Sequence, residues 1–201
     1  MEELIILGLD IHNLEVIDII NMGGKYKFIG LISDKDDHPD EHLGLPVLGG
    51  PAKLAQYPDV KRVPMHVWKD RNDKTGWVNV IAPSAFVAST AIIGRGCIIY
   101  PNCFIGANAC LKDGIFMLSR SVINHDNIIE NDVTVTSGVT LAGSVTVKEG
   151  AYLGQACTVK QYLTIGTKST VGMGAVVTRN VPDNTTVIGC PARETERSPS
   201  A

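Results

Sequence analysis

The sequence predicts a mainly β protein in which a parallel β-helix follows a small α/β domain. The first observation is a period of six: every sixth residue from Ile81 to Val177 is apolar without exception. A helix repeats its apolar residues near every 3.6 positions and a half-buried strand every second position, so this period fits neither. It is typical of hexapeptide repeats, whose short strands wrap around a narrow core. The second observation is a strand–helix–strand pattern in the first fifty residues.

The α/β domain is expected over residues 1–77. Residues 4–8 read as a buried strand ending in Gly8, residues 9–22 as an amphipathic helix, and Gly23-Gly24 as its stop signal. Residues 26–33 and 45–48 read as two further strands, which makes a βαβ, Rossmann-like unit with a parallel sheet. Residues 53–77 are polar and poorly patterned, so we expect an exposed connection there, with His66 at the surface.

The β-helix is expected over residues 78–193, and a polar tail over residues 194–201. The fourth residue after each apolar anchor is mostly small or apolar, which marks a second inward position. The residues between are rich in Gly, Pro, Asn and Asp, as in Pro101-Asn102 and Asn131-Asp132. Such residues suit tight corners. Three hexads make one triangular coil of 18 residues, so the block from 81 to 177 supplies a little over five coils.

Composition excludes several classes of function. A net charge of −3 and a pI near 5.9 leave no basic patch for nucleic acid or an anionic membrane surface. No run approaches the roughly 18 apolar residues of a membrane span. The N-terminus lacks the basic flank and cleavage site of a secretory signal. The five cysteines are odd in number and three occupy inward hexad positions, which suits a reducing cytoplasm.

A metal site is not expected either. No cysteine pair has the spacing of zinc ligands, and the β-helix contains a single histidine, His125. Zinc needs three or four protein ligands. We therefore expect no metal cofactor.

The turn after the first strand is the candidate acceptor site of the α/β domain. In βαβ units this turn lets a ligand phosphate reach backbone amides at the helix N-terminus, and here it contains Gly8, Asp10 and His12. Asp34, after the second strand, stands where an acid accepts hydrogen bonds from a ribose. The turn has one glycine only and Asp10 would repel a phosphate, so a small capping domain without a ligand remains an alternative.

His125-Asp126 is the candidate catalytic pair, because both residues fall on the turn positions of their hexad. A neutral imidazole can take a proton from an attacking amine or hydroxyl, and an adjacent carboxylate can orient the ring. A turn that contains His-Asp without a chemical role is the alternative. Counting in eighteens places His125, Gly143, Gln161 and Arg179 in one column. Gly143 would offer a backbone amide to a thioester, and Arg179 with Lys160 would suit phosphate groups.

Four motifs in the C-terminal half resemble those of the left-handed β-helix acyltransferases, which acetylate nucleotide-linked amino sugars or sialic acids. They are INHD at 123–126, LAGSV at 141–145, VGMGAVVTRNVP at 171–182 and IGCPAR at 188–193. The resemblance extends over nearly the whole chain. It implies a homotrimer that binds acetyl-CoA between neighbouring β-helices, with His125 as general base. The expected cofactor contacts are Ala142, Gly143, Lys160, Gln161, Gly172, Met173, Gly174 and Arg179, and the expected acceptor contacts are Gly8, Asp10, His12 and Asp34.

Trimer formation is also expected from the outward faces of the β-helix. They carry β-branched side chains that can pack on copies of themselves, and closed rotational symmetry is the usual result. The residues concerned are Ile98, Val122, Thr134, Thr140 and Val176.

Three departures from the family pattern concern the acceptor side. Leu9, Asp10 and Ile11 replace small residues of the N-terminal turn, Thr134 stands where a second histidine often follows, and Ala82 stands where histidine is usual. Two interpretations therefore remain. The first is an acetyl-CoA-dependent N- or O-acetyltransferase acting on a sugar. The second is a catalytically weakened β-helical trimer that binds a ligand or a partner.

Overall fold

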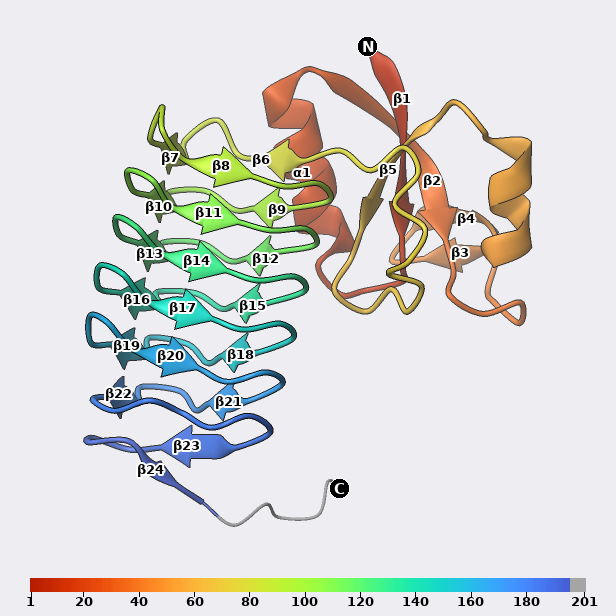
Figure 1. Cartoon of the computed structure of the whole chain (residues 1–201). Coiled ribbons are helices and arrows are strands. Elements are labelled where there is room, and N and C mark those ends of the chain that lie inside the picture. The colour runs from red at the N-terminus through yellow and green to blue at the C-terminus, as the bar shows by residue number, and fades with distance from the viewer. Residues whose placement is uncertain (196–201) are drawn as a thin grey trace.

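The structure is a computed structural model, and it describes residues 1–195. A stack of triangular coils runs through most of the chain, and an α/β domain packs beside the upper coils (Figure 1). Residues 196–201, the end of the expected polar tail, lie outside the described residues. Within residues 1–195, no helix has the length and apolarity that crossing a bilayer requires.

The N-terminal domain is built on a five-stranded sheet in the order β3-β4-β2-β1-β5. Strands β1, β2, β4 and β5 run parallel, and β3 pairs with β4 as an antiparallel hairpin. Strand β1, between β2 and β5, is buried on both faces from Leu4 to Leu7. The elements are β1 (Glu2–Leu7), α1 (Asn13–Gly23), β2 (Tyr26–Ile32), β3 (Glu41–His42), β4 (Leu45–Gly49), a 3-10 helix (Pro51–Gln56) and β5 (Lys61–Pro64).

Helix α1 begins at Asn13, four residues later than the sequence predicts. The Asp10 side chain accepts the His12 N–H at 2.8 Å, and the Asn13 side chain accepts the Asp10 N–H at 2.7 Å. These bonds fix a turn where the apolar spacing suggested helix. The helix ends as expected, because Gly24 adopts the left-handed conformation with φ 63° and closes the last turn.

The prediction of an exposed connection over residues 53–77 is wrong. Strand β5 pairs with β1, and Val63, Met65, Trp68 and Trp77 are buried. Arg62 in this strand is buried too, because its guanidinium donates to the Tyr57 carbonyl at 3.2 Å and lies 3.6 Å from the Asp73 carboxylate. The prolines and the charged run at residues 69–74 made the whole segment read as polar.

The β-helix has three faces, each a parallel sheet whose strands pair with a register of 18 residues, as in Val80↔Ile98. The first face contains β6 (Val80–Ile81), β9 (Ile98–Ile99), β12 (Phe116–Met117), β15 (Thr134–Val135), β18 (Tyr152–Leu153), β21 (Thr170–Val171), β23 (Thr186–Ile188) and β24 (Arg193–Glu194), the last antiparallel. The second face contains β7 (Phe86–Val87), β10 (Phe104–Ile105), β13 (Val122–Ile123), β16 (Thr140–Leu141), β19 (Thr158–Val159) and β22 (Val176–Val177). The third face contains β8 (Ile92–Ile93), β11 (Cys110–Leu111), β14 (Ile128–Ile129), β17 (Thr146–Val147) and β20 (Thr164–Ile165).

The hexad anchors point inward, and from Ile99 to Val177 all are buried, as predicted. The anchors of the top coil, Ile81, Val87 and Ile93, are half-buried because no coil lies above them. Corner residues such as Asn108 and Asp126 take φ of 59°, a conformation that Asn and Asp tolerate better than most residues. The corner between the first and second faces is called the first corner below, that between the second and third faces the second corner, and the remaining one the third corner.

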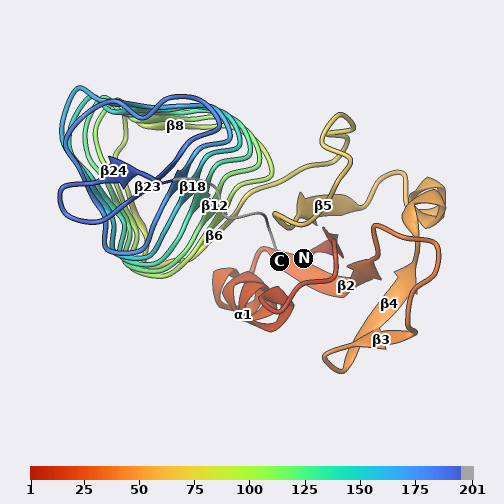
Figure 2. The ribbon, with the colours of Figure 1, turned by 90° about the horizontal axis from the view of Figure 1, so that it is seen from below.

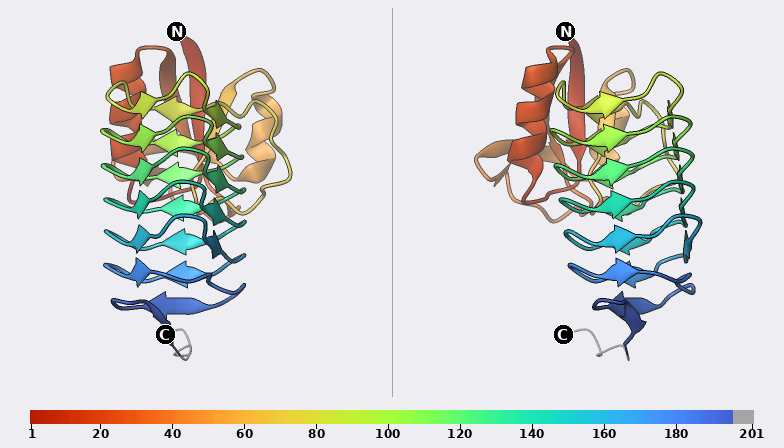
Figure 3. Two further views of the ribbon diagram at one scale, coloured as in Figure 1. Left: turned by 60° about the vertical axis from the view of Figure 1, so that its left-hand side comes forward. Right: turned by 90° about the vertical axis from the view of Figure 1, so that its left-hand side faces the viewer.

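The N-terminal domain lies against the first face of the β-helix, as the view along the coil axis shows (Figure 2). Only the upper coils are covered (Figure 3). Ile98, expected at an outward face free to pack on another copy, is 1% exposed because this domain covers it. Polar contacts fix the domain at two corners: Glu15 meets Tyr100 at the first, and Lys74 meets Asp113 at the third. The second corner stays clear of it.

Candidate active site

His125 and Asp126 lie at the second corner, between β13 and β14. The His125 Nδ1 is 2.7 Å from the Asp126 Oδ2, and the side chains are 62% and 48% exposed. A carboxylate can only accept, so this contact assigns the proton to Nδ1 and leaves the lone pair of Nε2 free. The pair therefore has the arrangement of an oriented base that is open to a ligand.

Asn108, one coil above, holds the other side of the carboxylate. Its side-chain amide donates to the Asp126 Oδ1 at 3.0 Å. The pKa of Asp126 is lowered mainly by this hydrogen bond and, to a smaller extent, by the hydrogen bond with His125. The sequence analysis did not single out Asn108, although its distance of 18 residues from Asp126 was the signal that could have found it.

Gly143 lies directly below His125. A Cβ added to Gly143 would stand 2.5 Å from the His125 Nε2, so the imidazole rests on a surface that only glycine provides. The next residue, Ser144, donates its N–H to the His125 carbonyl at 3.0 Å and joins the two coils. Among residues 1–195, no hydrogen bond engages the Gly143 N–H.

The side chain of Asn127 points into the β-helix and joins the coil that contains His125 to the coil that contains Gly143. Its side chain is fully buried, although the hexad pattern places small or apolar residues there. The amide donates to the carbonyls of Asn124 at 2.8 Å and Ala142 at 3.0 Å, and its oxygen accepts the Val145 N–H at 2.8 Å. Sequence reasoning missed this residue. Its polarity at an inward position was the available signal.

The column continues below Gly143 at the same corner. Lys160, Gln161 and Arg179 are exposed, and Ala142 is half-buried. The last coil is two residues shorter on the third face, where Val181 pairs with Ile165. Arg179 contributes there to a hollow of about 280 Å³ that Arg193 also lines.

Three predicted cofactor contacts lie elsewhere. Gly172, Met173 and Gly174 follow β21 and therefore belong to the first corner, across the second face from His125. Met173 is 74% exposed. A single chain thus divides the expected cofactor contacts between two corners.

The N-terminal turn lies at the first face, away from His125. Of its predicted contacts, Asp10 is buried within the turn, and Gly8 packs so closely that a Cβ would meet Val67 at 3.0 Å. Asp34 pairs with Lys69 at 3.2 Å. His12 alone faces a groove, of about 340 Å³, which passes down the first face to Met173.

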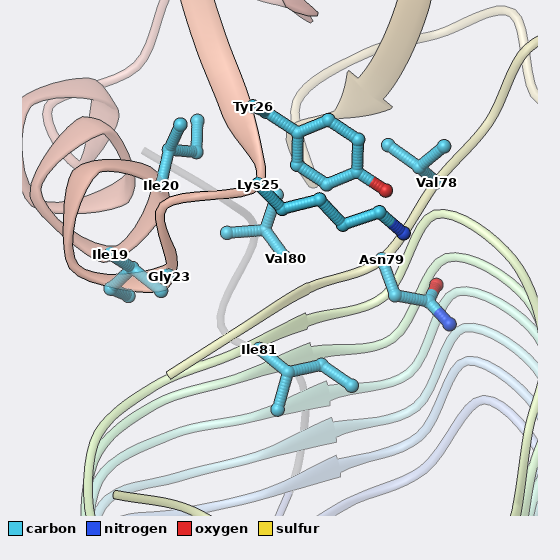
Figure 4. Close-up of a pocket in the computed structure, with 9 residues that line it drawn as sticks. All are labelled: Ile19, Ile20, Gly23, Lys25, Tyr26, Val78, Asn79, Val80 and Ile81. Carbon is cyan, nitrogen blue, oxygen red and sulfur yellow. The ribbon is translucent and has the colours of Figure 1, made fainter. Parts of the chain in front are cut away.

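A larger hollow of about 460 Å³ lies between the end of α1 and the first coil (Figure 4). Its lining is mostly apolar, with Lys25 over the Tyr26 ring at 4.9 Å. The Asn79 amide is already bonded to Gly94 and Cys97 at 2.7 and 2.9 Å. These groups leave little chemistry for a ligand, and we assign this hollow to packing between the two domains.

No group of three or more side chains suited to a metal ion occurs among the described residues. No protein-family model matches the chain.

Solved structures match it along nearly its whole length. PerB from Caulobacter crescentus, in complex with CoA and GDP-perosamine, is 26% identical with a TM-score of 0.85, over 98% of both chains. The acetyltransferase domain of PglB from Neisseria gonorrhoeae, in complex with acetyl coenzyme A, is 25% identical with a TM-score of 0.85, over 96% of this chain and 99% of that one. A mutant of the Caulobacter GDP-perosamine N-acetyltransferase is 25% identical with a TM-score of 0.86. The predicted fold is confirmed: the chain has the architecture of the left-handed β-helix acyltransferases.

Proposed function

We propose that the protein is an acetyl-CoA-dependent N-acetyltransferase that acts on the amino group of a sugar. The observation that carries the proposal is the oriented imidazole of His125 above Gly143. The structural neighbours, acetyltransferases solved with CoA, acetyl-CoA or an amino-sugar nucleotide, support the same reaction. The alternative of a binding protein with weakened catalysis predicts little or no binding of acetyl-CoA.

The chemistry follows from the His125 pair. The acceptor amine attacks the thioester carbonyl carbon, and His125 Nε2 takes the proton that the nitrogen loses. The C–N bond forms, the C–S bond breaks, and the proton passes from the imidazolium to the departing CoA thiolate. Asp126 stabilises the imidazolium between these steps. The Gly143 N–H is the donor that we assign to the oxyanion of the tetrahedral intermediate.

Acetyl-CoA would lie along the second corner, below His125. The thioester belongs beside Gly143, next to the half-buried Ala142. Arg179 and Lys160 are exposed cations farther down, suited to the phosphates of the nucleotide end. Gln161 is next to Lys160 in the sequence and stands one coil above Arg179. Gly172, Met173 and Gly174 would complete the site from another copy of the chain.

We propose a homotrimer, because the divided cofactor contacts meet only between copies. If three chains turn their second faces toward a common axis, the first corner of each lies beside the second corner of the next. The second face has the apolar surface for this: Phe86 and Phe104 are exposed and stacked at 4.9 Å, above Val122 and Val176. Light scattering should give about three times the chain mass of 21.5 kDa, and a monomeric mass would refute this assembly.

We also propose a cytoplasmic location. All five cysteines are unpaired thiols, which fits a reducing compartment.

The His125→Ala variant tests the function. General-base catalysis contributes about 10²- to 10⁴-fold, so kcat should fall by that factor while acetyl-CoA binding, measured by calorimetry, stays within about twofold. Calorimetry and turnover with a panel of amino sugars separate the alternatives. Little or no binding of acetyl-CoA favours the weakened protein and would sink the proposed enzyme.

A further inference from the structure

We propose that helix α1 of one copy packs on the upper third face of the next copy, so that the N-terminal domain joins neighbouring chains. The partner for both surfaces is therefore a second copy of this chain. The inference rests on the trimer proposed above, in which the first corner of each copy lies beside the second corner of the next. It goes beyond that assembly by assigning a contact to two surfaces that a single chain leaves open.

The outward row of the third face is apolar in the upper coils and polar in the lower ones. Ile92 is 65% exposed and Ile128 is 44% exposed, with the half-buried Cys110 between them. The next two residues of the row are Thr146 and Thr164. Large apolar side chains that are exposed side by side, rather than singly, mark a surface that another molecule covers.

The first face shows what accompanies such a change within one row. Its upper residues Ile98 and Phe116 are 1% and 3% exposed, because the N-terminal domain of the same chain covers them. The row then continues with Thr134, Tyr152 and Thr170, below most of the domain (Figure 3). Apolar residues thus stand at the level of an N-terminal domain. The third face has them at the same level, but no domain within residues 1–195 lies on it (Figure 2).

Helix α1 carries the second open surface. Leu14 and Met22 are 46% and 60% exposed, and they share one side of the helix with the exposed Asp18 because the three are four residues apart. A hollow of about 240 Å³ separates this side from the first corner, where Tyr100 and Ser119 line it. The exposed side of α1 therefore lies at the corner that the next copy approaches.

The proposed trimer brings the two surfaces together. Because the coils are triangular, three second faces that close around an axis leave the first face of one copy level with the third face of the next. Cyclic symmetry also keeps equal coils at equal height. Tyr100 and Cys110 belong to one coil, and Ser119 and Ile128 belong to the coil below. Helix α1 thus lies at the height of the apolar row.

Cross-linking through a native thiol tests the contact. Met22→Cys should be joined to Cys110 of the next copy by a short dimaleimide, which gives covalent dimers and trimers on a denaturing gel. Cys190→Ser removes the exposed thiol of the last coil from every variant. Cys110→Ser should abolish the link. The matched control is Ala55→Cys, because Ala55 is exposed on the 3-10 helix, which packs on the sheet face opposite α1.

The outcomes separate this inference from the proposals on which it rests. A protein of trimeric mass that gives no link with Met22→Cys would overturn the contact and leave the trimer standing. A link that persists in Cys110→Ser, or that appears equally with Ala55→Cys, would overturn it too. A monomeric mass would refute the trimer and the contact together. None of these measurements needs turnover, so failure of the acetyltransferase reaction is recognised separately.

Ile92→Glu tests the surface from the other side. The side chain is mostly exposed in one chain, so a carboxylate there costs the monomer little, but the contact would bury it against the acidic helix of the next copy. The trimer should then dissociate at a protein concentration about tenfold higher or more, measured by sedimentation over a dilution series in sub-denaturing urea. Thr164→Glu, lower in the same row, is the matched control. Equal dissociation of Ile92→Glu and the wild-type protein would contradict the inference.

Discussion

The β-helix and the N-terminal domain each present an imidazole beside a carboxylate, but they hold it in different ways. His125 and Asp126 are neighbours in sequence at a corner that the coils above and below fix from both sides. His12 and Glu15 occupy the start of a helix, and their third partner, Tyr100, comes from the other domain. The first pair belongs to a stack of coils that are joined to one another by backbone hydrogen bonds. The second exists in this form only while the two domains stay docked.

The largest effect is expected for Gly143→Ala, because the new methyl group would overlap the His125 ring. The ring must move away from the thioester, so kcat should fall about 10²- to 10⁴-fold, as for loss of the general base. Gly23→Ala is the matched control, since a Cβ at Gly23 meets nothing within 4 Å. Steady-state kinetics check it. If Gly143→Ala kept the wild-type kcat, the assignment of the catalytic site to His125 and Gly143 at the second corner would be wrong.

The next effect is on stability. Asn127→Ala leaves two carbonyls and one N–H without their partner inside the coil, at a cost of about 1–3 kcal/mol. Asn131→Ala, which removes one bond from a half-buried corner, should cost less. Thermal unfolding at one protein concentration compares the two. Equal losses would show that the buried amide has no special part in the catalytic corner.

Tyr100→Phe tests the pair that depends on docking. It removes one hydrogen bond to Glu15, so KM for the sugar should rise about two- to tenfold while kcat at saturation changes little. His125 lies at another corner, and acetyl-CoA binding should be untouched. A fall in kcat without a rise in KM for the sugar would show that Tyr100 affects the chemical step, and the two histidine–carboxylate pairs would then not differ in role.

The smallest effect is expected for Asn108→Gly. It removes the bond that lowers the pKa of Asp126, so this pKa rises toward its ordinary value. The titration of the Asp126 carboxyl group, followed by NMR, should therefore move to higher pH. Glycine keeps the positive φ of the corner, and Asn102→Gly, with the same φ of 59°, is the control. An unchanged profile in Asn108→Gly would contradict this role.

The comparison also explains what the sequence could predict. In the β-helix each residue's position follows from its number, because the register of 18 never slips before the last coil. Gly143 below His125 was therefore predictable. So was the division of the expected cofactor contacts between two corners, since Gly172 and Ala142 are 30 residues apart, which is not a multiple of 18.

The N-terminal domain has no such rule. Strand β5 was missed because the partners of the buried Arg62 side chain, the carbonyls of Leu54 and Tyr57 and the Asp73 carboxylate, lie outside the strand, and no local pattern reveals them. The helix start was misplaced because the Asp10 and Asn13 side chains replace the first helical bonds. The contact of Tyr100 with Glu15 joins residues 85 positions apart. Such contacts depend on docking, and periodicity carries no information about it.

The constant distance between coils has a consequence for the choice of acyl donor. Strands in a sheet are about 4.8 Å apart, so the three coils from His125 to Arg179 span about 14 Å. Because every coil bonds its backbone to the next, this length cannot adjust to the ligand. A small donor such as acetyl phosphate could reach the imidazole or the arginine but not both at once. In the proposed site the stack thereby sets the length of the donor, and a molecule with a long arm between its thioester and its phosphates would contact both ends.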